Sequence, residues 1–257
     1  MTADFLNLAD GRKLAYLKQD AQKQDNQSPI IVFLAGHGSD MYGSKAEALA
    51  TYCAAHNHGF LRFDYTGHGL SSGAFLDGTI SAWTDDTNQI LDHLTDGPVI
   101  LVGSSLGGWI MLNVAKDRGD KICGLIGIAA APDFTETLIW DSLDDDQKDM
   151  MAQEGVIALP NPYAEEDVIY PYALITDGRD NLLLDKPLSI TCPIILHQGM
   201  ADHEVPWQTA CHIAEAVTSQ DVTLNIVKSS GHRFSSEAEI AMIISSVEDL
   251  LDRLKTS

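Results

Sequence analysis

Apolar runs and amphipathic stretches alternate along most of the chain. Runs rich in β-branched residues predict strands at 29–34, 60–64, 99–103, 122–130, 192–197 and 222–227. Apolar residues recurring every three to four positions predict helices at 44–56, 80–94, 106–114, 207–217 and from near 236 onward. Continuous apolar runs are typical of strands buried on both faces, and strand–helix alternation is typical of a parallel sheet. We therefore expect an α/β fold with a mostly parallel central sheet flanked by helices.

Local signals refine this pattern. Asp10-Gly11 separates two short apolar runs, 5–8 and 14–17, and predicts a hairpin, so the sheet should begin with antiparallel strands. Ser44-x-x-Glu47 and Ser236-x-x-Glu239 have the spacing of a capping box, in which each end of the motif satisfies a backbone N–H of the other. Both motifs therefore predict helix starts.

The alternation breaks between residues 133 and 190. This segment contains several prolines and aromatic residues, and a run of aspartates at 144–146 that we interpret as the solvated start of a helix. We expect an inserted cap subdomain at 133–190, built of short helices with room for one small hairpin. The remainder, 1–132 and 191–257, would then form a single core.

A strand-to-turn-to-helix pattern surrounds Ser105. The strand at 99–103 ends in Gly103-x-Ser105-x-Gly107, and a buried helix can begin at Leu106. This is the nucleophile-elbow pattern, in which a sharp turn presents a serine and the flanking glycines leave room for the turn. The pattern alone is short, but its strand-before, helix-after context makes Ser105 the candidate nucleophile.

A serine hydroxyl needs a base and an orienting acid to act as a nucleophile. Asp202 follows the strand at 192–197, and His232 follows the last strand, so both should lie at the carboxyl edge of the sheet. In folds with this elbow the residues occur in the order serine, acid, histidine. We therefore expect a triad of Ser105, Asp202 and His232. Asp133 also follows a core strand and stays open as an alternative acid.

The backbone around the serine should also hold an oxyanion. The N–H of Leu106, at the start of the helix, and that of His37, in the first strand-to-helix loop, are the expected donors. His68 reads as structural. A metal site is not expected, because Asp202-His203-Glu204 are adjacent and cannot easily converge on one ion.

The predicted cap contains more apolar and aromatic residues than a solvent-exposed insertion requires. We expect it to supply an acyl channel, although the same residues could simply pack the cap onto the core. The candidate substrate-binding residues are Trp140, Met150, Met151, Tyr163, Tyr170 and Tyr172.

Composition adds bounds on partners. The net charge is −21, which disfavours nucleic acid and anionic surfaces. No apolar run approaches membrane-spanning length, so no stable membrane insertion is expected. The first residues show neither a basic nor an apolar targeting region, and we expect a cytoplasmic protein. The sequence does not indicate an oligomeric state.

The motifs together resemble a known family. Phe63-Asp64-Tyr65-x-Gly67-x-Gly69-x-Ser71, Val102-Gly-Ser-Ser-Leu-Gly-Gly-Trp109 and Gly199-Met-x-Asp202-x-x-Val205-Pro-Trp207 are similar to α/β-hydrolase-fold serine hydrolases. Within that fold the chain resembles the branch of the mitochondrial palmitoyl-protein thioesterase and acyl-glucuronide esterase of animals and its bacterial relatives. The resemblance implies hydrolysis of acyl thioesters and esters by Ser105, Asp202 and His232.

We therefore expect a cofactor-free serine hydrolase that cleaves acyl thioesters or carboxylic esters, on a small molecule or an acylated protein, through an acyl-enzyme. Palmitoyl thioesters are one candidate substrate. The alternatives are a small-ester carboxylesterase, or C–C bond hydrolysis or perhydrolysis on the same fold. A non-catalytic binding protein is a further alternative, although a receptor needs no aligned base.

Overall fold

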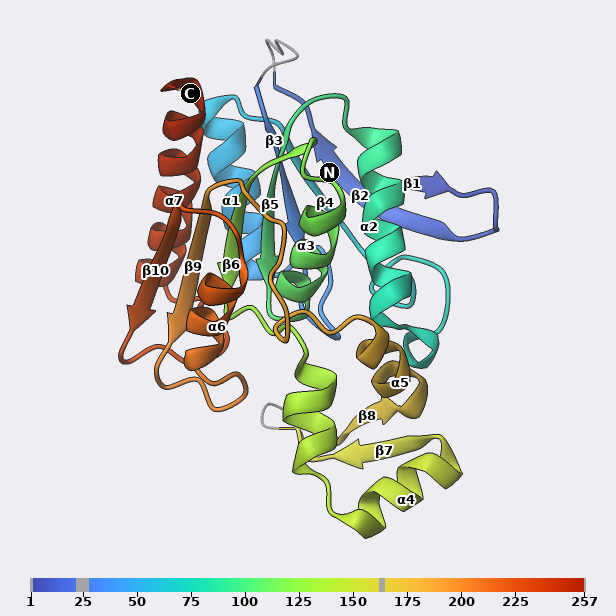
Figure 1. Cartoon of the computed structure of the whole chain (residues 1–257). Helices are drawn as coiled ribbons and strands as arrows, with labels where there is room; N and C mark the ends of the chain where they lie inside the picture. Colours follow the sequence, from blue (N-terminus) through green and yellow to red (C-terminus); the bar gives the residue numbers. More distant parts are fainter. Residues whose placement is uncertain (1, 22–27, 162–164, 257) are drawn as a thin grey trace.

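The computed structural model describes residues 2–21, 28–161 and 165–256, and in this part of the chain a sheet of eight strands runs through the centre (Figure 1). Its strands are β1 (Asp4–Asn7), β2 (Lys13–Gln19), β3 (Ile30–Leu34), β4 (Phe60–Phe63), β5 (Val99–Ser104), β6 (Ile122–Ile128), β9 (Ile194–Gly199) and β10 (Val222–Val227). Their spatial order is β1-β2-β4-β3-β5-β6-β9-β10. The pairs β1–β2 and β2–β4 are antiparallel and all other pairs are parallel, which confirms the predicted hairpin and the mostly parallel sheet.

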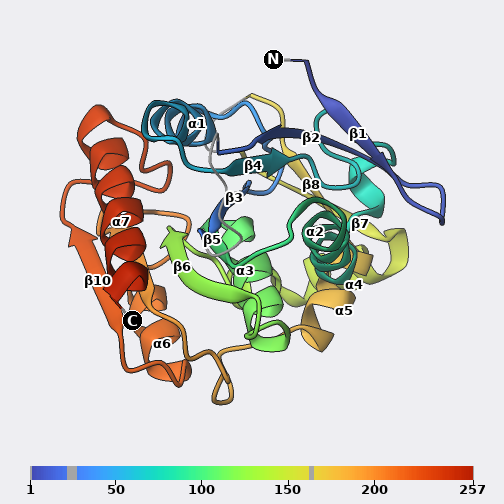
Figure 2. The same ribbon diagram turned by 90° about the horizontal axis from the view of Figure 1, so that it is seen from above.

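Helices cover both faces of the sheet. They are α1 (Ser44–His56), α2 (Ile80–Leu94), α3 (Leu106–Asp117), α6 (Gln208–Ala216) and α7 (Glu237–Thr256). Seen from above, α1 and α7 lie on one side of the sheet and α2, α3 and α6 on the other (Figure 2). Every residue of β5 is buried, and so are residues 106–115 of α3. The strand and the helix that flank Ser105 are therefore fixed in the core.

The described residues of 133–180 lie beyond the carboxyl ends of the parallel strands, and residues 181–190 return alongside the core, where Leu183, Leu188 and Ile190 join the main hydrophobic cluster (Figure 1). The segment 133–190 contains a π-helical turn η2 (Thr135–Ile139), a short turn η3 (Trp140–Ser142), α4 (Asp145–Glu154), the strands β7 (Val156–Leu159) and β8 (Val168–Pro171), and α5 (Tyr172–Asp180). β7 and β8 form a separate antiparallel ribbon, the small hairpin for which the sequence left room. The aspartate run does start a helix, because the side chain of Asp144 caps α4.

One of the two predicted capping boxes is present. Ser236 and Glu239 bond each other's backbone N–H groups at the start of α7, as expected. The box at Ser44 is wrong: α1 begins at that residue, with Gly43 as the N-cap and no side-chain cap. The carboxylate of Glu47 instead lies 2.7 Å from the guanidinium of Arg62. This ion pair uses the carboxylate that a capping box would direct to the backbone N–H of Ser44.

Candidate active site

Ser105 occupies a strained turn between β5 and α3. Its φ of 53° and ψ of −117° lie in a region that side chains rarely adopt. The turn is held from both sides, because the N–H of Ser105 donates to the carbonyl of Ile128 at 2.9 Å and its carbonyl accepts from Ala131 at 3.1 Å. These bonds anchor the serine to the end of β6, so its side chain projects from a rigid position.

The two elbow glycines are required by close backbone contacts. A Cβ on Gly103 would lie 2.4 Å from the carbonyl oxygen of Gly107, and a Cβ on Gly107 would lie 2.2 Å from that of Leu34. Both distances are far inside van der Waals contact. The strand, the elbow and the neighbouring β3 can therefore pack this tightly only with glycine at both positions.

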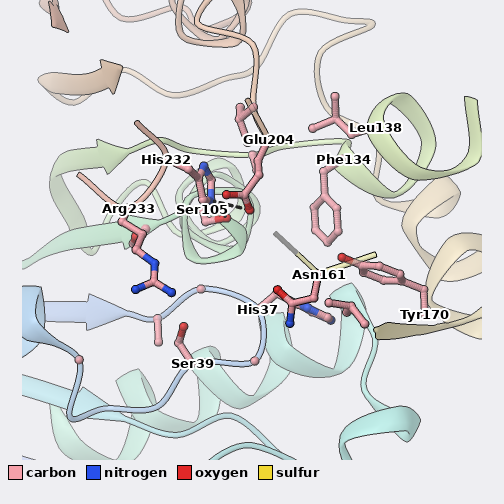
Figure 3. A pocket seen from close by; sticks show the side chains of 18 of the residues that line it. His37, Ser39, Ser105, Phe134, Leu138, Asn161, Tyr170, Glu204, His232 and Arg233 are labelled. Atoms are coloured by element: carbon pink, nitrogen blue, oxygen red, sulfur yellow. Dashed lines mark hydrogen bonds and ion pairs between the residues drawn. The ribbon is translucent and has the colours of Figure 1, made fainter. Parts of the chain in front are cut away.

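His232 connects the serine to an acid. Its Nε2 lies 3.0 Å from Oγ of Ser105 (Figure 3). Its Nδ1 lies 2.9 Å from Oδ2 of Asp202. With the proton on Nδ1, the imidazole donates to the carboxylate and accepts the serine proton at Nε2. The structure thus brings together the three residues that the sequence placed at the ends of separate strands.

Asp202 is buried, and every oxygen of its carboxylate has a donor. Oδ1 accepts from the N–H groups of Glu204 and Val205 at 2.9 and 2.8 Å, and Oδ2 also accepts from the amide of Gln198 at 2.8 Å. Burial by itself raises the pKa of Asp202, but the hydrogen bond from His232, its charge and the backbone donors outweigh burial and lower the pKa below its ordinary value. The carboxylate is therefore ionised and fixed in orientation.

Asp133 is used elsewhere. Its two carboxylate oxygens accept from the N–H groups of Leu183 and Leu184, each at 2.9 Å, and its own φ is 61°. These bonds tie the start of the segment 133–190 to the chain near the end of that segment. Between the two aspartates that the sequence left open, the geometry at His232 selects Asp202.

The loop after β3 lies against the serine. A Cβ on Gly36 would be 3.4 Å from Cβ of Ser105, so the peptide of His37 is close to the nucleophile. The N–H of Gly38 donates to Nε2 of His68 at 3.2 Å, which gives the buried His68 a structural role in holding this loop. Leu106 begins α3, and its N–H therefore has no acceptor one turn earlier in the helix. Both expected oxyanion donors therefore lie next to Ser105, and their role is a proposal.

The His37 ring lies among other aromatic side chains. It stacks on Tyr170 at a centroid distance of 5.5 Å and contacts Phe75 at 4.8 Å and Phe134 at 6.2 Å. Burial lowers the pKa of His37 to about 3, so the ring is neutral near pH 7. The ring therefore forms part of an aromatic surface and carries no positive charge near pH 7.

A cavity of about 1060 Å³ opens beside Ser105, between the core loops and the segment 133–190. Its apolar side is lined by Phe75, Leu76, Phe134, Leu138, Ile139, Leu159, Ile169 and Tyr170. Polar and charged side chains line the remainder, among them Lys45. Ser39, Glu204 and Arg233 belong to the same part of the lining (Figure 3). Ser105 thus lies where an apolar surface meets a polar one.

The predicted channel residues have mixed outcomes. Tyr170 lines the cavity, whereas Tyr163 lies outside the described residues. Four others are not among the residues that line the cavity. Met151, Trp140 and Tyr172 pack in a small core of their own segment, and Met150 is 43% exposed. Phe134 and Leu138 also line the cavity and were not predicted. Both lie within five residues of Asp133, which was already placed near the sheet edge.

In the part of the chain that the structure describes, no group of three or more His, Cys, Asp or Glu side chains could hold a metal ion. A family model described as the alpha/beta hydrolase family matches residues 31–241. The chain belongs to the α/β-hydrolase family.

Three proteins similar to this α/β hydrolase match it over nearly its whole length. It is 40% identical over 253 residues to the human protein named palmitoyl-protein thioesterase ABHD10, mitochondrial, over 98% of this chain and 81% of the human one. The solved structure of alpha/beta hydrolase domain-containing protein 10 from mouse has a TM-score of 0.90 and 36% identity, over 99% of this chain and 100% of that one. A putative hydrolase from Agrobacterium vitis S4 has a TM-score of 0.91 at 36% identity, over 97% and 98% of the chains.

These relatives confirm the resemblance seen in the sequence. They give no support to a cytoplasmic location, because the human protein's name places that protein in mitochondria, and the compartment of this hydrolase stays a prediction. Within residues 2–21, 28–161 and 165–256, none of the helices has the length and apolar character needed to cross a membrane.

Proposed function

We propose that the protein is a serine hydrolase of acyl thioesters and carboxylic esters, with long-chain acyl thioesters as its preferred substrates. The observation that carries the proposal is the hydrogen-bonded series Ser105–His232–Asp202 at the border of an apolar cavity. A base aligned on a strained serine is needed for covalent catalysis and has no use in a passive binding protein.

The geometry supports a two-step reaction. Oγ of Ser105 attacks the acyl carbonyl carbon while Nε2 of His232 takes its proton, and Asp202 stabilises the resulting imidazolium. The N–H groups of Leu106 and His37 hold the oxyanion. The imidazolium then protonates the departing thiolate or alkoxide, and the acyl group stays on Ser105. Water, deprotonated by the same imidazole, releases the acid, and these steps need no cofactor.

The cavity and the relatives together support a long acyl chain. The apolar side of the cavity combines core residues, such as Phe75, with Leu138 and Ile169 of the segment 133–190. It can bury a hydrocarbon chain next to the nucleophile. The human relative's name specifies a palmitoyl-protein thioesterase. We therefore assign the segment 133–190 as a cap over the core of 1–132 and 191–257. The acyl group would lie along the apolar side of the cavity. The leaving group, from a small molecule or an acylated protein, would lie toward the polar side.

Active-site labelling tests the nucleophile. A fluorophosphonate probe should label the wild type with one equivalent and should not label Ser105→Ala, while the neighbouring Ser104→Ala variant keeps its labelling. Peptide mapping identifies the modified residue. Labelling that persists in Ser105→Ala would refute the proposal.

A substrate panel tests the reaction class. Uncharged acyl thioesters and oxygen esters from butanoyl to palmitoyl should all be hydrolysed, with loss of all these activities in Ser105→Ala. Turnover of a C–C substrate or formation of peracid from acetate and peroxide, without turnover of any thioester or ester, would instead assign one of the alternative reactions of this fold.

A further inference from the structure

A second carboxylate faces the catalytic imidazole. Oε2 of Glu204 lies 3.8 Å from Nε2 of His232, the nitrogen that contacts Ser105 (Figure 3). Glu204 is two residues beyond Asp202, and its N–H donates to Oδ1 of that residue at 2.9 Å. The loop that carries the acid therefore also fixes the backbone of Glu204. Its side chain is 35% exposed and lines the cavity, so it is open to solvent and substrate.

The contact changes in strength during the reaction. In the resting state Nε2 carries no proton, and a carboxylate at 3.8 Å gains little from a neutral ring. Once Ser105 has transferred its proton, Nε2 carries the proton and the ring is positive, so the attraction to Glu204 becomes favourable. An interaction that strengthens as charge develops acts on the barrier rather than on substrate binding.

Other charged groups surround this imidazole, and Glu204 differs from them in position. Asp202 holds the opposite nitrogen, Nδ1. Arg233 follows His232 in the chain, and Nζ of Lys45, from α1, donates to the carbonyl of Arg233 at 2.6 Å. On the β8 side, burial raises the pKa of Tyr170 and the charge of Glu204 raises it further, so this phenol is neutral near pH 7. The negative charge at Nε2 therefore comes from Glu204.

We propose that Glu204 is a specificity-determining residue that favours thioesters over oxygen esters of the same acyl group. The inference rests on the proposed function, since it requires His232 to act as base and acid. A carboxylate beside Nε2 makes the imidazole a stronger base toward Ser105 and makes the imidazolium a weaker acid toward the leaving group.

The two leaving groups respond differently to this change. A thiol has a pKa near about 8.5, so the thiolate departs with little help from a proton. An alkoxide is far more basic and requires proton transfer as the C–O bond breaks. In either case the proton first moves from Oγ to Nε2 as the bond from Oγ to the acyl carbon forms. It then moves from Nε2 to the sulfur or oxygen of the leaving group as the bond from that atom to the acyl carbon breaks. A weaker acid therefore slows the oxygen ester more than the thioester.

The test uses the full chain and one matched pair of substrates, decanoyl-N-acetylcysteamine and its oxygen analogue. In Glu204→Gln, the acid limb of the pH profile of kcat/KM should move to lower pH by about half a unit. This is the size expected for the loss of one partly exposed opposite charge. The ratio of thioester to oxygen-ester kcat/KM should fall about threefold, since half a pK unit is about a threefold change. Both effects should shrink in concentrated salt.

Matched variants separate the causes. Glu215→Gln, on the exposed surface of α6, makes the same change in net charge and should leave the acid limb and the ratio unchanged. Glu204→Asp keeps the charge and should retain at least part of both effects. If Glu204→Gln does not give a native circular dichroism spectrum, Glu204→Ser replaces it.

The outcomes distinguish this inference from the proposed function. An unchanged acid limb and ratio in Glu204→Gln, or equal shifts in Glu215→Gln, would overturn the role of Glu204 while leaving the triad in place. Hydrolysis of both substrates by Ser105→Ala would instead overturn the proposed function itself.

Discussion

Oδ2 of Asp202 lies 2.9 Å from Nδ1 of His232, while the carboxylate of Asp133 is occupied by the N–H groups of Leu183 and Leu184. The two aspartates are both buried and both follow core strands. Their different partners imply different consequences on substitution, because one orients the catalytic base and the other holds two chain segments together.

Replacing each aspartate by asparagine separates these roles. In Asp202→Asn the amide favours the wrong imidazole tautomer, and kcat should fall by about a thousandfold or more, by analogy with the serine proteases. Asp133→Asn should keep kcat within about tenfold, while its unfolding free energy drops by about 1–3 kcal/mol because one N–H loses its acceptor. Steady-state kinetics and urea unfolding measure the two effects. A larger loss of kcat in Asp133→Asn would transfer the orienting role to that residue.

The elbow predicts a strong dependence on glycine. In Gly107→Ala the new Cβ would lie 2.2 Å from the carbonyl oxygen of Leu34, so the backbone of β3 or α3 must move. We expect a loss of about 2–4 kcal/mol in unfolding free energy. In the control Gly119→Ala the nearest neighbour of the new Cβ is 3.8 Å away, and stability should change by less than about 1 kcal/mol. Equal stability of the two variants in urea would show that the elbow tolerates a side chain.

The sequence was sufficient for the nucleophile and the base of the triad because parallel strands bring their carboxyl ends to one edge of the sheet. Ser105 and His232 each follow such a strand, so the chain order of strands and loops was enough to place them together. It was not sufficient for the acid. Asp202 and Asp133 satisfy the same rule, and the choice depends on which loop crosses toward His232, a tertiary property without a local signal.

Two other features were decided by contacts distant in sequence. The capping box at Ser44 failed because Glu47 pairs with Arg62 on a neighbouring strand. In the cap, composition identified an apolar segment but could not say which side chains face the cavity. Tyr170 faces it, whereas Met151 is buried within the segment. The position of Glu204 beside His232 likewise follows from the fold of its loop.

The apolar side of the cavity predicts a dependence on acyl length. In the wild type, kcat/KM for uncharged thioesters should rise from butanoyl toward palmitoyl, because each buried methylene contributes roughly 0.8 kcal/mol. Leu138→Gln places an amide on the cavity wall and should flatten this rise. Met150→Gln, on an exposed residue of α4, should leave it unchanged. A flat profile in the wild type would indicate a small-ester esterase.

A buried histidine away from the site predicts how stability depends on pH. His197 is buried on β9, and its Nε2 lies 2.9 Å from Oγ of Ser246. Its Nδ1 has no hydrogen-bond partner among the described residues. Burial lowers the pKa of His197 to about 4. In the unfolded chain a histidine titrates near about 6.5, so between these values the unfolded state binds the extra proton.

The unfolding free energy should therefore decrease as the pH falls from about 6.5 toward 4, by up to about 1.36 kcal/mol per pH unit from this residue. In His197→Gln the drop between pH 7 and pH 5 should be smaller than in the wild type by about 2 kcal/mol. His212→Gln, on the exposed face of α6, serves as the control and should follow the wild type. Urea unfolding at the two pH values measures the difference. An identical drop in wild type and His197→Gln would mean that this imidazole is protonated equally in the folded and unfolded chains.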